Sequence, residues 1–303
     1  GVEYYSCFGN HILNSFSSTG NFGQSIRRGS ALCTIDNATA EHVGGDAPVI
    51  VWEGSNLCVV NNIKVDGTQG NTNHAKIGFY FNTCWDCVGS NFTGKNLADV
   101  VSVQFCRGGI TVDNIIGVNV GNLILTYASF GVVSNTGVKR GHYKGSITDY
   151  DAALFTVSES FDVQISGLKD NAKYQNDVSS GRAHIFRSFG VDIGGVSAPN
   201  IILWNSVDDD KRYEPSDSKM KVKDSSFKSG FVTQTYAQGQ AQTRLTVFDD
   251  VTFKQNLSLK FVHNVTLRNS RVLGQDVDKS IILTGSYFLR LIDSFVKNAS
   301  LGI

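Results

Sequence analysis

Carboxylates that could act as a catalytic pair gather in the middle third of this 303-residue chain. Hydrolysis of a glycosidic bond needs one protonated carboxyl group to serve the leaving oxygen and one ionised carboxylate to act as base or nucleophile. Glu159, in the stretch VSESF, lies at a bend between two predicted strands, where partial burial would favour its protonated form. We therefore expect Glu159 to be the acid, and Asp151, Asp208 or Asp210 to be the base. The alternative is structural, because bend carboxylates often only form turns and an Asp-Asp-Asp run often solvates a loop tip or loosely binds calcium.

Aromatic and basic side chains surround these carboxylates in the sequence. Aromatic rings stack on the apolar faces of sugars, and polar groups bond the sugar hydroxyls, so this mixture favours a carbohydrate groove over a solvated loop set. The predicted substrate-binding residues are Tyr143, Tyr150, Tyr174, Arg182, His184, Trp204 and Tyr213. No metal or cofactor is expected.

A lyase would use some of the same residues differently. Elimination needs a base to take the proton beside a uronate carboxylate, and a cation to neutralise that carboxylate. His142, His184 or Tyr150 could be the base, with Arg182 or Lys144 as the cation. No spacing selects among them, so hydrolase and lyase both remain open at this stage.

A repeat of about 26 residues determines how these side chains must be positioned. In each repeat, Asn, Asp, Gly or Ser forms a bend and is followed by an apolar residue, because the small polar types tolerate left-handed backbone angles. The apolar positions after the bends are Ile63, Phe92, Ile115, Val138, Leu168, Val196, Phe227, Val251, Val272 and Phe295. The pattern predicts that Ser160 and Ser188 lie one above the other in adjacent repeats.

Three short strands in each repeat predict an all-β, single-stranded, right-handed parallel β-helix of about ten or more coils. A leucine-rich repeat or a propeller would need a different period. Residues 1–45 are expected to form an N-terminal capping or lead-in segment, and residues 46–303 the β-helix.

Three consecutive repeats are longer than the others, at 30, 28 and 31 residues. The extra residues fall at 139–151, 169–184 and 204–219, which include most of the candidate site residues. Since each insertion follows an apolar repeat position, we expect all three loops to leave along one edge of the rod and to form a wall or cleft there.

Composition excludes several functions. The formal net charge is zero, which argues against binding to nucleic acid or to an acidic membrane surface. No apolar run is long enough to cross a bilayer. The six cysteines all lie within the first 106 residues, and in a chain of this size they are interpreted as buried free thiols. Cys84 and Cys87 have CxxC spacing, but no second such pair follows, so packing is preferred to a zinc or redox site.

The repeat segments resemble the β-helix of bacteriophage tailspikes, which belong to the pectin-lyase-like superfamily. The segments that carry the resemblance are SNLCVVNNIKVDG, GGITVDNIIGVNV, SESFDVQISGLKD and SFGVDIGGVSAPNI, and the likeness covers about residues 45 to 300. It implies a homotrimer on a virion tail that contacts other phage tail proteins and binds and cleaves bacterial surface polysaccharide. A non-catalytic adhesin on the same fold is the alternative.

Overall fold

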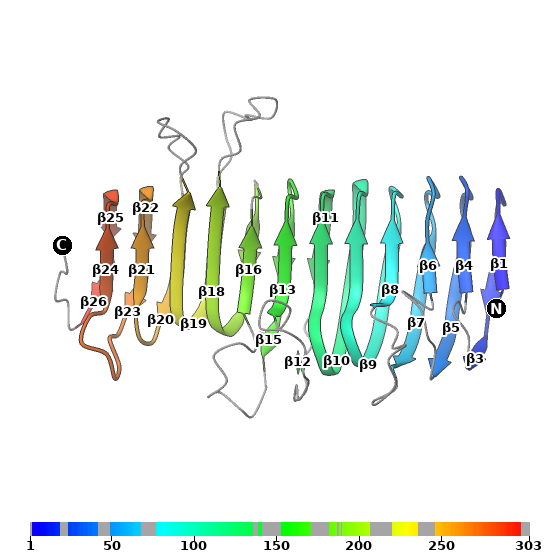
Figure 1. The fold of residues 1–303 in the computed structure, drawn as a ribbon, viewed down its shortest axis with the longest axis horizontal. Helices are drawn as coiled ribbons and strands as arrows, with labels where there is room; N and C mark the ends of the chain where they lie inside the picture. The colour runs from blue at the N-terminus through cyan, green and yellow to red at the C-terminus, as the bar shows by residue number, and fades with distance from the viewer. Residues whose placement is uncertain are drawn as a thin grey trace.

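The computed structural model describes most of the chain as strands wound into one long rod (Figure 1). It describes residues 2–18, 24–41, 49–67, 77–135, 139–140, 153–170, 182–186, 188, 190–206, 220–235 and 246–297. Every element among these residues is a strand, and none is a helix that could cross a membrane. All pairings between strands are parallel within this part of the chain, from β1 with β4 to β23 with β26.

Each coil of the rod has three faces, which we number in chain order. Face 1 contains β1 (Val2–Tyr5), β4 (Gln24–Arg27), β6 (Val49–Val51), β8 (Ile77–Asn82), β13 (Ala153–Ser158), β16 (Arg182–Phe186), β21 (Leu257–Lys260) and β24 (Ile281–Thr284). Face 2 contains β2 (His11–Leu13), β11 (Phe130–Asn135), β14 (Gln164–Ser166), β17 (Asp192–Gly194), β22 (His263–Arg268) and β25 (Tyr287–Ile292). Face 3 contains β3 (Phe16–Ser18), β12 (Lys139–Arg140), β15 (Lys169–Asp170), β23 (Arg271–Val272) and β26 (Phe295–Val296).

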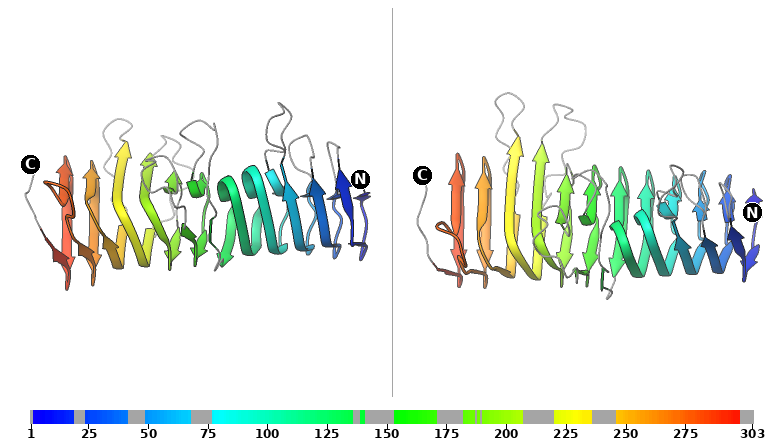
Figure 2. Two further views of the ribbon diagram at one scale, coloured as in Figure 1. Left: turned by 90° about the horizontal axis from the view of Figure 1, so that it is seen from below. Right: turned by 60° about the horizontal axis from the view of Figure 1, so that its bottom comes forward.

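The remaining strands continue around one or two corners, as the curved arrows in Figure 2 show. Three strands cover faces 2 and 3, namely β5 (Thr34–Glu41), β7 (Val59–Asp66) and β20 (Thr246–Phe253). Three others continue from face 2 through face 3 to face 1, namely β9 (Val88–Gln104), β10 (Arg107–Tyr127) and β19 (Met220–Thr235). One strand, β18 (Ser197–Ser206), covers faces 3 and 1.

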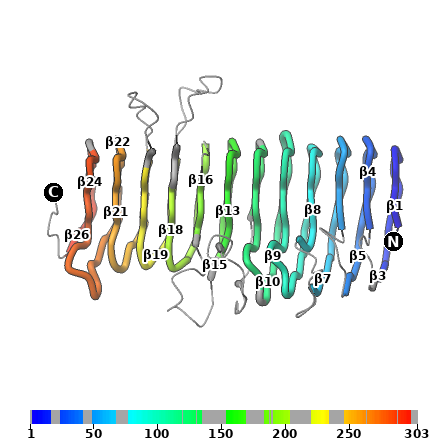
Figure 3. Tube along the Cα trace, viewed as in Figure 1, coloured from blue at the N-terminus to red at the C-terminus, as the bar shows by residue number. Residues whose placement is uncertain are grey.

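The register links twelve coils, so the prediction of a parallel β-helix is confirmed. On face 2 the residues in register are Ile12, Ile35, Val60, Gly89, Val112, Ser134, Ile165, Ile193, Val222, Phe248, Leu267 and Leu291. Pairing starts with Val2 opposite Gln24, so the first two coils lie inside the segment 1–45 that was expected to form a capping or lead-in segment. Figure 3 traces the coils from the N-terminal to the C-terminal end.

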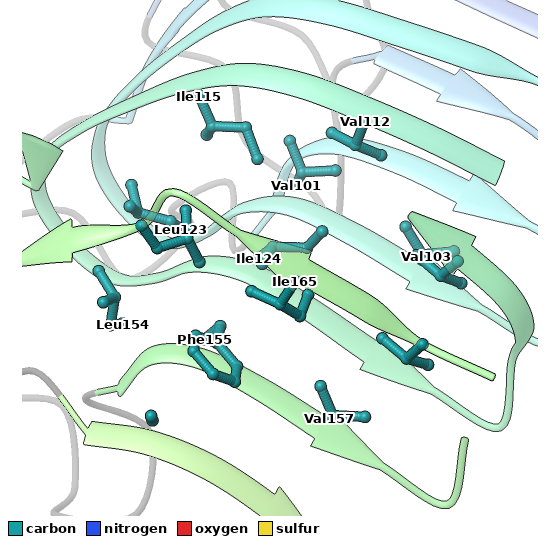
Figure 4. Close-up of a cluster of buried hydrophobic side chains, with 14 of the residues drawn as sticks. Val101, Val103, Val112, Ile115, Leu123, Ile124, Leu154, Phe155, Val157 and Ile165 are labelled. Carbon is teal, nitrogen blue, oxygen red and sulfur yellow. The ribbon is translucent and has the colours of Figure 1, made fainter. Parts of the chain in front are cut away.

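Inward side chains from the three faces make one continuous core. Figure 4 shows Val101, Ile124 and Phe155 on face 1 pointing toward Val112 and Ile165 on face 2. All five are at most 1% exposed. Alternation along each strand places every second side chain inside, so the period-2 pattern of the sequence builds this core.

The corner between faces 2 and 3 has one left-handed residue in each coil where it is described. These residues are Asn14, Asn37, Asn62, Asn91, Asn114, Gly167, Gly195, Asp224, Asp250, Asn269 and Asp293. Asn, Asp and Gly are the types that adopt this backbone conformation at least cost, which explains the repeated bends seen in the sequence. Neighbouring corners also bond each other, since Asn37 Nδ2 donates to Asn14 Oδ1 at 2.6 Å.

Most repeat positions read from the sequence are correct, and three are wrong. Ile63, Phe92 and Ile115 are in register, as predicted. Val251, however, pairs with Ser225 and not with Phe227. In three of the later coils a serine directly follows the corner, namely Ser225, Ser270 and Ser294. The apolar residues predicted for that position, Phe227, Val272 and Phe295, therefore lie one or two residues further along the chain. Val138 lies outside the described residues.

Candidate functional site

A hollow of about 330 Å³ lies on the outer surface of face 1. We call it the face 1 hollow. It crosses three adjacent coils, because residues of β18, β19 and β21 contribute side by side. Its lining residues are Asn200, Ile201, Ile202, Ser229, Gly230, Phe231, Asn256 and Ser258.

Strand alternation explains why the hollow has an apolar floor on an outer surface. Ile202 pairs with Phe231, and Phe231 pairs with Ser258, so these three side chains form one outward row. Phe231 is 37% exposed. Gly230 lies next to this row, and a Cβ there would come within 2.5 Å of the Phe253 ring in the core below. Gly230 therefore leaves room for the Phe253 ring, which packs directly beneath the hollow.

The polar groups around the hollow are amides and hydroxyls. Asn200 pairs with Ser229, which places an amide beside a hydroxyl at one edge. Ser229 Oγ donates a hydrogen bond to Gln255 Oε1 at 3.4 Å. The described lining includes no carboxylate, so these residues can hold a sugar ring against Phe231 but cannot supply acid or base catalysis.

Basic side chains flank the hollow in the sequence. Lys228 precedes Ser229, Lys254 lies two residues before Asn256, and Lys260 lies two residues after Ser258. All three are exposed, and Lys260 Nζ lies 5.6 Å from the centre of the Phe261 ring. This part of the surface is therefore compatible with neutral or acidic sugars.

Three of the predicted substrate-binding residues lie on the same face. Arg182 pairs with Asn200, and His184 pairs with Ile202, so both are one coil from the hollow. Trp204 pairs with Thr233, further along the same strands. His184 is half-buried, and its ring centre lies 6.5 Å from that of Phe186. The side chains of Arg182 and Trp204 are outside the described part of the structure.

Glu159 lies at the corner where face 1 turns toward face 2. Its backbone is left-handed, with φ of 48°, and its N–H donates to the carbonyl of Phe186 at 2.9 Å. Its side chain is partly buried. The same corner in other coils holds left-handed Ser6, Thr83, Phe105, Ala128, Phe261 and Gly285, so the backbone geometry does not depend on a carboxylate. Glu159 thus shares a face with His184 and Trp204 but lies two coils from the hollow, at the other end of the strand.

The other predicted site residues lie outside the described residues. They are Asp151, Asp208, Asp210, Tyr143, Tyr150, Tyr174 and Tyr213, together with the lyase candidates His142 and Lys144. Their roles remain predictions.

The expectation that all three long insertions share one edge is wrong for the third. Arg140 pairs with Asp170, and Ala153 pairs with Arg182, so the first two insertions begin on face 3 and end on face 1. The third begins after Ser206, at the end of a face 1 strand, and ends at Met220, before face 2. Chain spacing could not reveal this, because a coil has the same length whether residues are added before or after face 1.

One carboxylate on face 1 was missed by sequence reasoning. Asp99 lies on the outer side of β9 and accepts a hydrogen bond from Asn122 Nδ2 at 2.7 Å. Thr156 Oγ1 donates to Asn122 Oδ1 at 3.1 Å, so the network crosses three coils. His184 is the register neighbour of Thr156 in the next coil. Asp99 lies in the strand segment NLADVVSV. The only sign in the sequence that its side chain faces outward is its place among apolar residues of a strand.

The cysteines are free thiols, as predicted, and all except the partly exposed Cys7 are buried. Cys33, Cys58 and Cys87 occupy one inward position in successive coils, before face 2. Among the described residues, no group of three or more His, Cys, Asp or Glu side chains is arranged to hold a metal ion.

Neither a protein-family model nor a curated protein sequence matches the chain. Among solved structures, the A-module of mannuronan C-5 epimerase AlgE6 from Azotobacter vinelandii is 12% identical, with a TM-score of 0.42 over 100% of this chain and 78% of that one. Tailspike gp49 of Acinetobacter baumannii bacteriophage Fri1, a capsular polysaccharide depolymerase, is 8% identical, with a TM-score of 0.39, and 98% of this chain covers 63% of it. A Yersinia enterocolitica Family 28 exopolygalacturonase is 13% identical, with a TM-score of 0.34, and 92% of this chain covers 47% of it. The chain thus spans less than two thirds of the last two, and the likeness is one of fold alone.

Proposed function

We propose that this protein binds and hydrolyses a bacterial surface polysaccharide, as the receptor-binding spike of a phage tail. The substrate would be a capsule, an exopolysaccharide or a lipopolysaccharide O-antigen. The observation that supports polysaccharide binding is the face 1 hollow, which is lined by Phe231 and by amides and hydroxyls. A stacked ring surrounded by neutral hydrogen-bonding groups is suited to recognise a sugar.

Binding in the hollow would place the polymer across several coils of face 1. Arg182 and His184 lie on β16, one coil toward the N-terminus from the hollow, and Trp204 lies on β18, which lines it. A polymer that extends from the hollow along face 1 would therefore pass these positions next. Neighbouring coils are about 4.8 Å apart, which is close to the length of one sugar unit, so successive sugars can meet successive coils.

For the chemistry, we propose that Glu159 protonates the leaving oxygen and that Asp208 or Asp210 activates water. Ser206, the last described residue before them, ends β18 at the corner that Glu159 occupies two coils earlier. Two coils separate Ser206 from Glu159 by about 9.6 Å along the rod, which is close to the upper limit of roughly 9.5 Å for inverting glycosidases and supports this pair as a proposal. Asp151 is the weaker candidate for the base, since Ala153, its nearest described neighbour, starts face 1 at the opposite end of the strand.

Two other functions use the same surface. A lyase would take its base from His184, which is half-buried on face 1 beside the hollow. An adhesin would bind without cleavage, which the absence of carboxylates from the described lining favours. The sequence resemblance also supports a homotrimer on the virion tail, in contact with other tail proteins and acting outside the host cell.

Incubation with purified capsule or O-antigen from a susceptible strain separates these functions. New reducing ends without ultraviolet absorbance indicate hydrolysis, absorbance of an unsaturated uronate indicates elimination, and an intact polymer that stays bound indicates an adhesin. Glu159→Gln should abolish release of oligosaccharides and leave polymer binding unchanged. Unchanged turnover in this variant would remove Glu159 from the mechanism.

A further inference from the structure

Four buried cysteines lie close together in coils 3 to 5, namely Cys58, Cys84, Cys87 and Cys106, and we call them the thiol cluster. Each is at most 1% exposed. Cys84 Sγ lies 3.5 Å from Cys106 Sγ. Cys87 lies three residues after Cys84 in the same coil, and its Sγ contacts the carbonyl of Trp85 at 3.3 Å. The proposed sugar chemistry does not use these groups.

The cluster consists of two pairs that join neighbouring coils. The N–H of Arg107 donates to the carbonyl of Cys84 at 3.1 Å, which places Cys106 directly above Cys84. In the same way, the N–H of Val88 donates to the carbonyl of Cys58 at 2.9 Å, which places Cys87 above Cys58. Adjacent parallel strands are about 4.8 Å apart, a separation that lies inside the Cα–Cα range of disulfides, roughly 4.4–6.8 Å.

We propose that the thiol cluster is an oxidation site in which Cys84–Cys106 and Cys58–Cys87 disulfides join three successive coils. The oxidant is a small-molecule disulfide. The thiolate of Cys84 attacks it, one small thiol leaves, and a mixed disulfide forms on Cys84. The thiolate of Cys106 then attacks the Cys84 sulfur and releases the second small thiol. Two protein thiols lose two electrons, and one oxidant molecule is reduced to two thiols.

Burial determines when this reaction takes place. The contact with Cys106, the contact with Cys87 and burial all raise the pKa of Cys84, so little thiolate is present in the closed coil. The native protein should therefore oxidise slowly, and faster when the coils open. This inference does not rest on the proposed function, although a disulfide would be useful to a protein that acts outside the cell.

The test uses the full chain with oxidised glutathione at pH 8, with and without urea below the unfolding transition. Remaining thiols are then blocked with iodoacetamide, and peptides are mapped without reduction. We expect two fewer alkyl groups for each disulfide, a cross-linked Cys84–Cys106 peptide, and faster oxidation in urea. The cross-linked protein should show an increase of about 30-fold or more in the ratio of folded to unfolded molecules.

Cys7 and Cys33 provide internal controls. Cys7 is partly exposed and should form only a glutathione adduct. Cys33 is buried below Cys58, since the N–H of Val59 donates to its carbonyl at 2.9 Å, and it does not lie in the column of Cys84 and Cys106, so Cys33→Ser should leave the Cys84–Cys106 cross-link intact. Cys106→Ser should remove it. Alkylation of all four cluster thiols after Cys7 has fully reacted, or a Cys84–Cys87 peptide in place of the inter-coil pair, would overturn the proposal.

Discussion

Ser188 Oγ accepts a hydrogen bond from the backbone N–H of Ser160 at 3.1 Å and donates one to the carbonyl of Phe186 at 2.7 Å. Both serines are at most 1% exposed. The relationship repeats one coil earlier, where Ser160 Oγ accepts from the N–H of Ser129 at 3.2 Å. A small hydroxyl in these coils thus satisfies a buried backbone donor of the preceding coil, which strand pairing alone leaves unmet at this corner.

Substitution of Ser188 by Ala should lower the free energy of unfolding by about 1–3 kcal/mol, because the N–H of Ser160 is then buried without an acceptor. Urea denaturation measures the change. Ser286→Ala is the matched control, since Ser286 Oγ accepts from Val262 N–H at 3.1 Å at a partly exposed position and should cost less. Equal losses in the two variants would contradict the role of burial.

The sequence predicted the coils well where an apolar residue follows the bend, as at Ile63, Phe92 and Ile115. It failed at Ser225, Ser270 and Ser294, where serine occupies that position and bonds the backbone of the previous coil. Serine at a strand start looks like part of the bend, so the next apolar residue was chosen instead. The error has a physical cause, because both an apolar group and a bonded hydroxyl can fill that place.

The candidate site was harder to predict than the fold. The sequence indicated that the site would lie in the long insertions, whereas the hollow is lined by residues of regular strands, such as Asn200 and Phe231. Alternation identifies these positions as outward but not as concave. Concavity depends on which residues of neighbouring coils lie beside each other, as Ile202, Phe231 and Ser258 do, and only the three-dimensional register reveals this.

Replacement of Thr126 by Val should stabilise the protein. Thr126 pairs with Val103 and Val157 in the core, is fully buried, and its Oγ1 has no partner among the described hydrogen-bonding groups. An apolar group of the same shape removes the desolvation cost, so unfolding should require about 1 kcal/mol more. Val103→Thr, the reverse change one coil away, should lower stability by a similar amount, and a loss in both variants would show that the hydroxyl is satisfied.

Removal of the aromatic floor should weaken polysaccharide binding. Phe231→Ala should reduce affinity for the polymer roughly three- to tenfold, which corresponds to the 0.5–1.5 kcal/mol of a stacking contact. Isothermal titration with a repeat-unit oligosaccharide measures this. Phe288→Ala tests specificity, since Phe288 is 67% exposed in the last coil and does not line the hollow. An equal effect of both variants would place the sugar elsewhere.

Acidic pH should remove one interaction on face 2. The Arg268 guanidinium donates to the Asp249 carboxylate and holds the pKa of Asp249 below its ordinary value. The stabilisation is therefore present above the pKa of an unfolded aspartate and is lost as the pH falls through the lower pKa of the folded state. An NMR titration of Asp249 should show this pKa rise in Arg268→Gln, and an unchanged value would mean that the pair does not form in solution.

Two of the buried hydroxyls without a hydrogen-bond partner among the described groups, Thr126 Oγ1 and Ser134 Oγ, belong to the same coil, the sixth of twelve, whereas Ser25 Oγ and Ser280 Oγ lie near the two ends of the rod. In a solenoid each layer touches only the layers directly above and below, so the energy of the rod is a sum of nearest-neighbour terms. Two buried hydroxyls without a partner lower the stability of the sixth coil, because their desolvation is not compensated by hydrogen bonds. We therefore expect heat to loosen the sixth coil before the coils directly on either side of it.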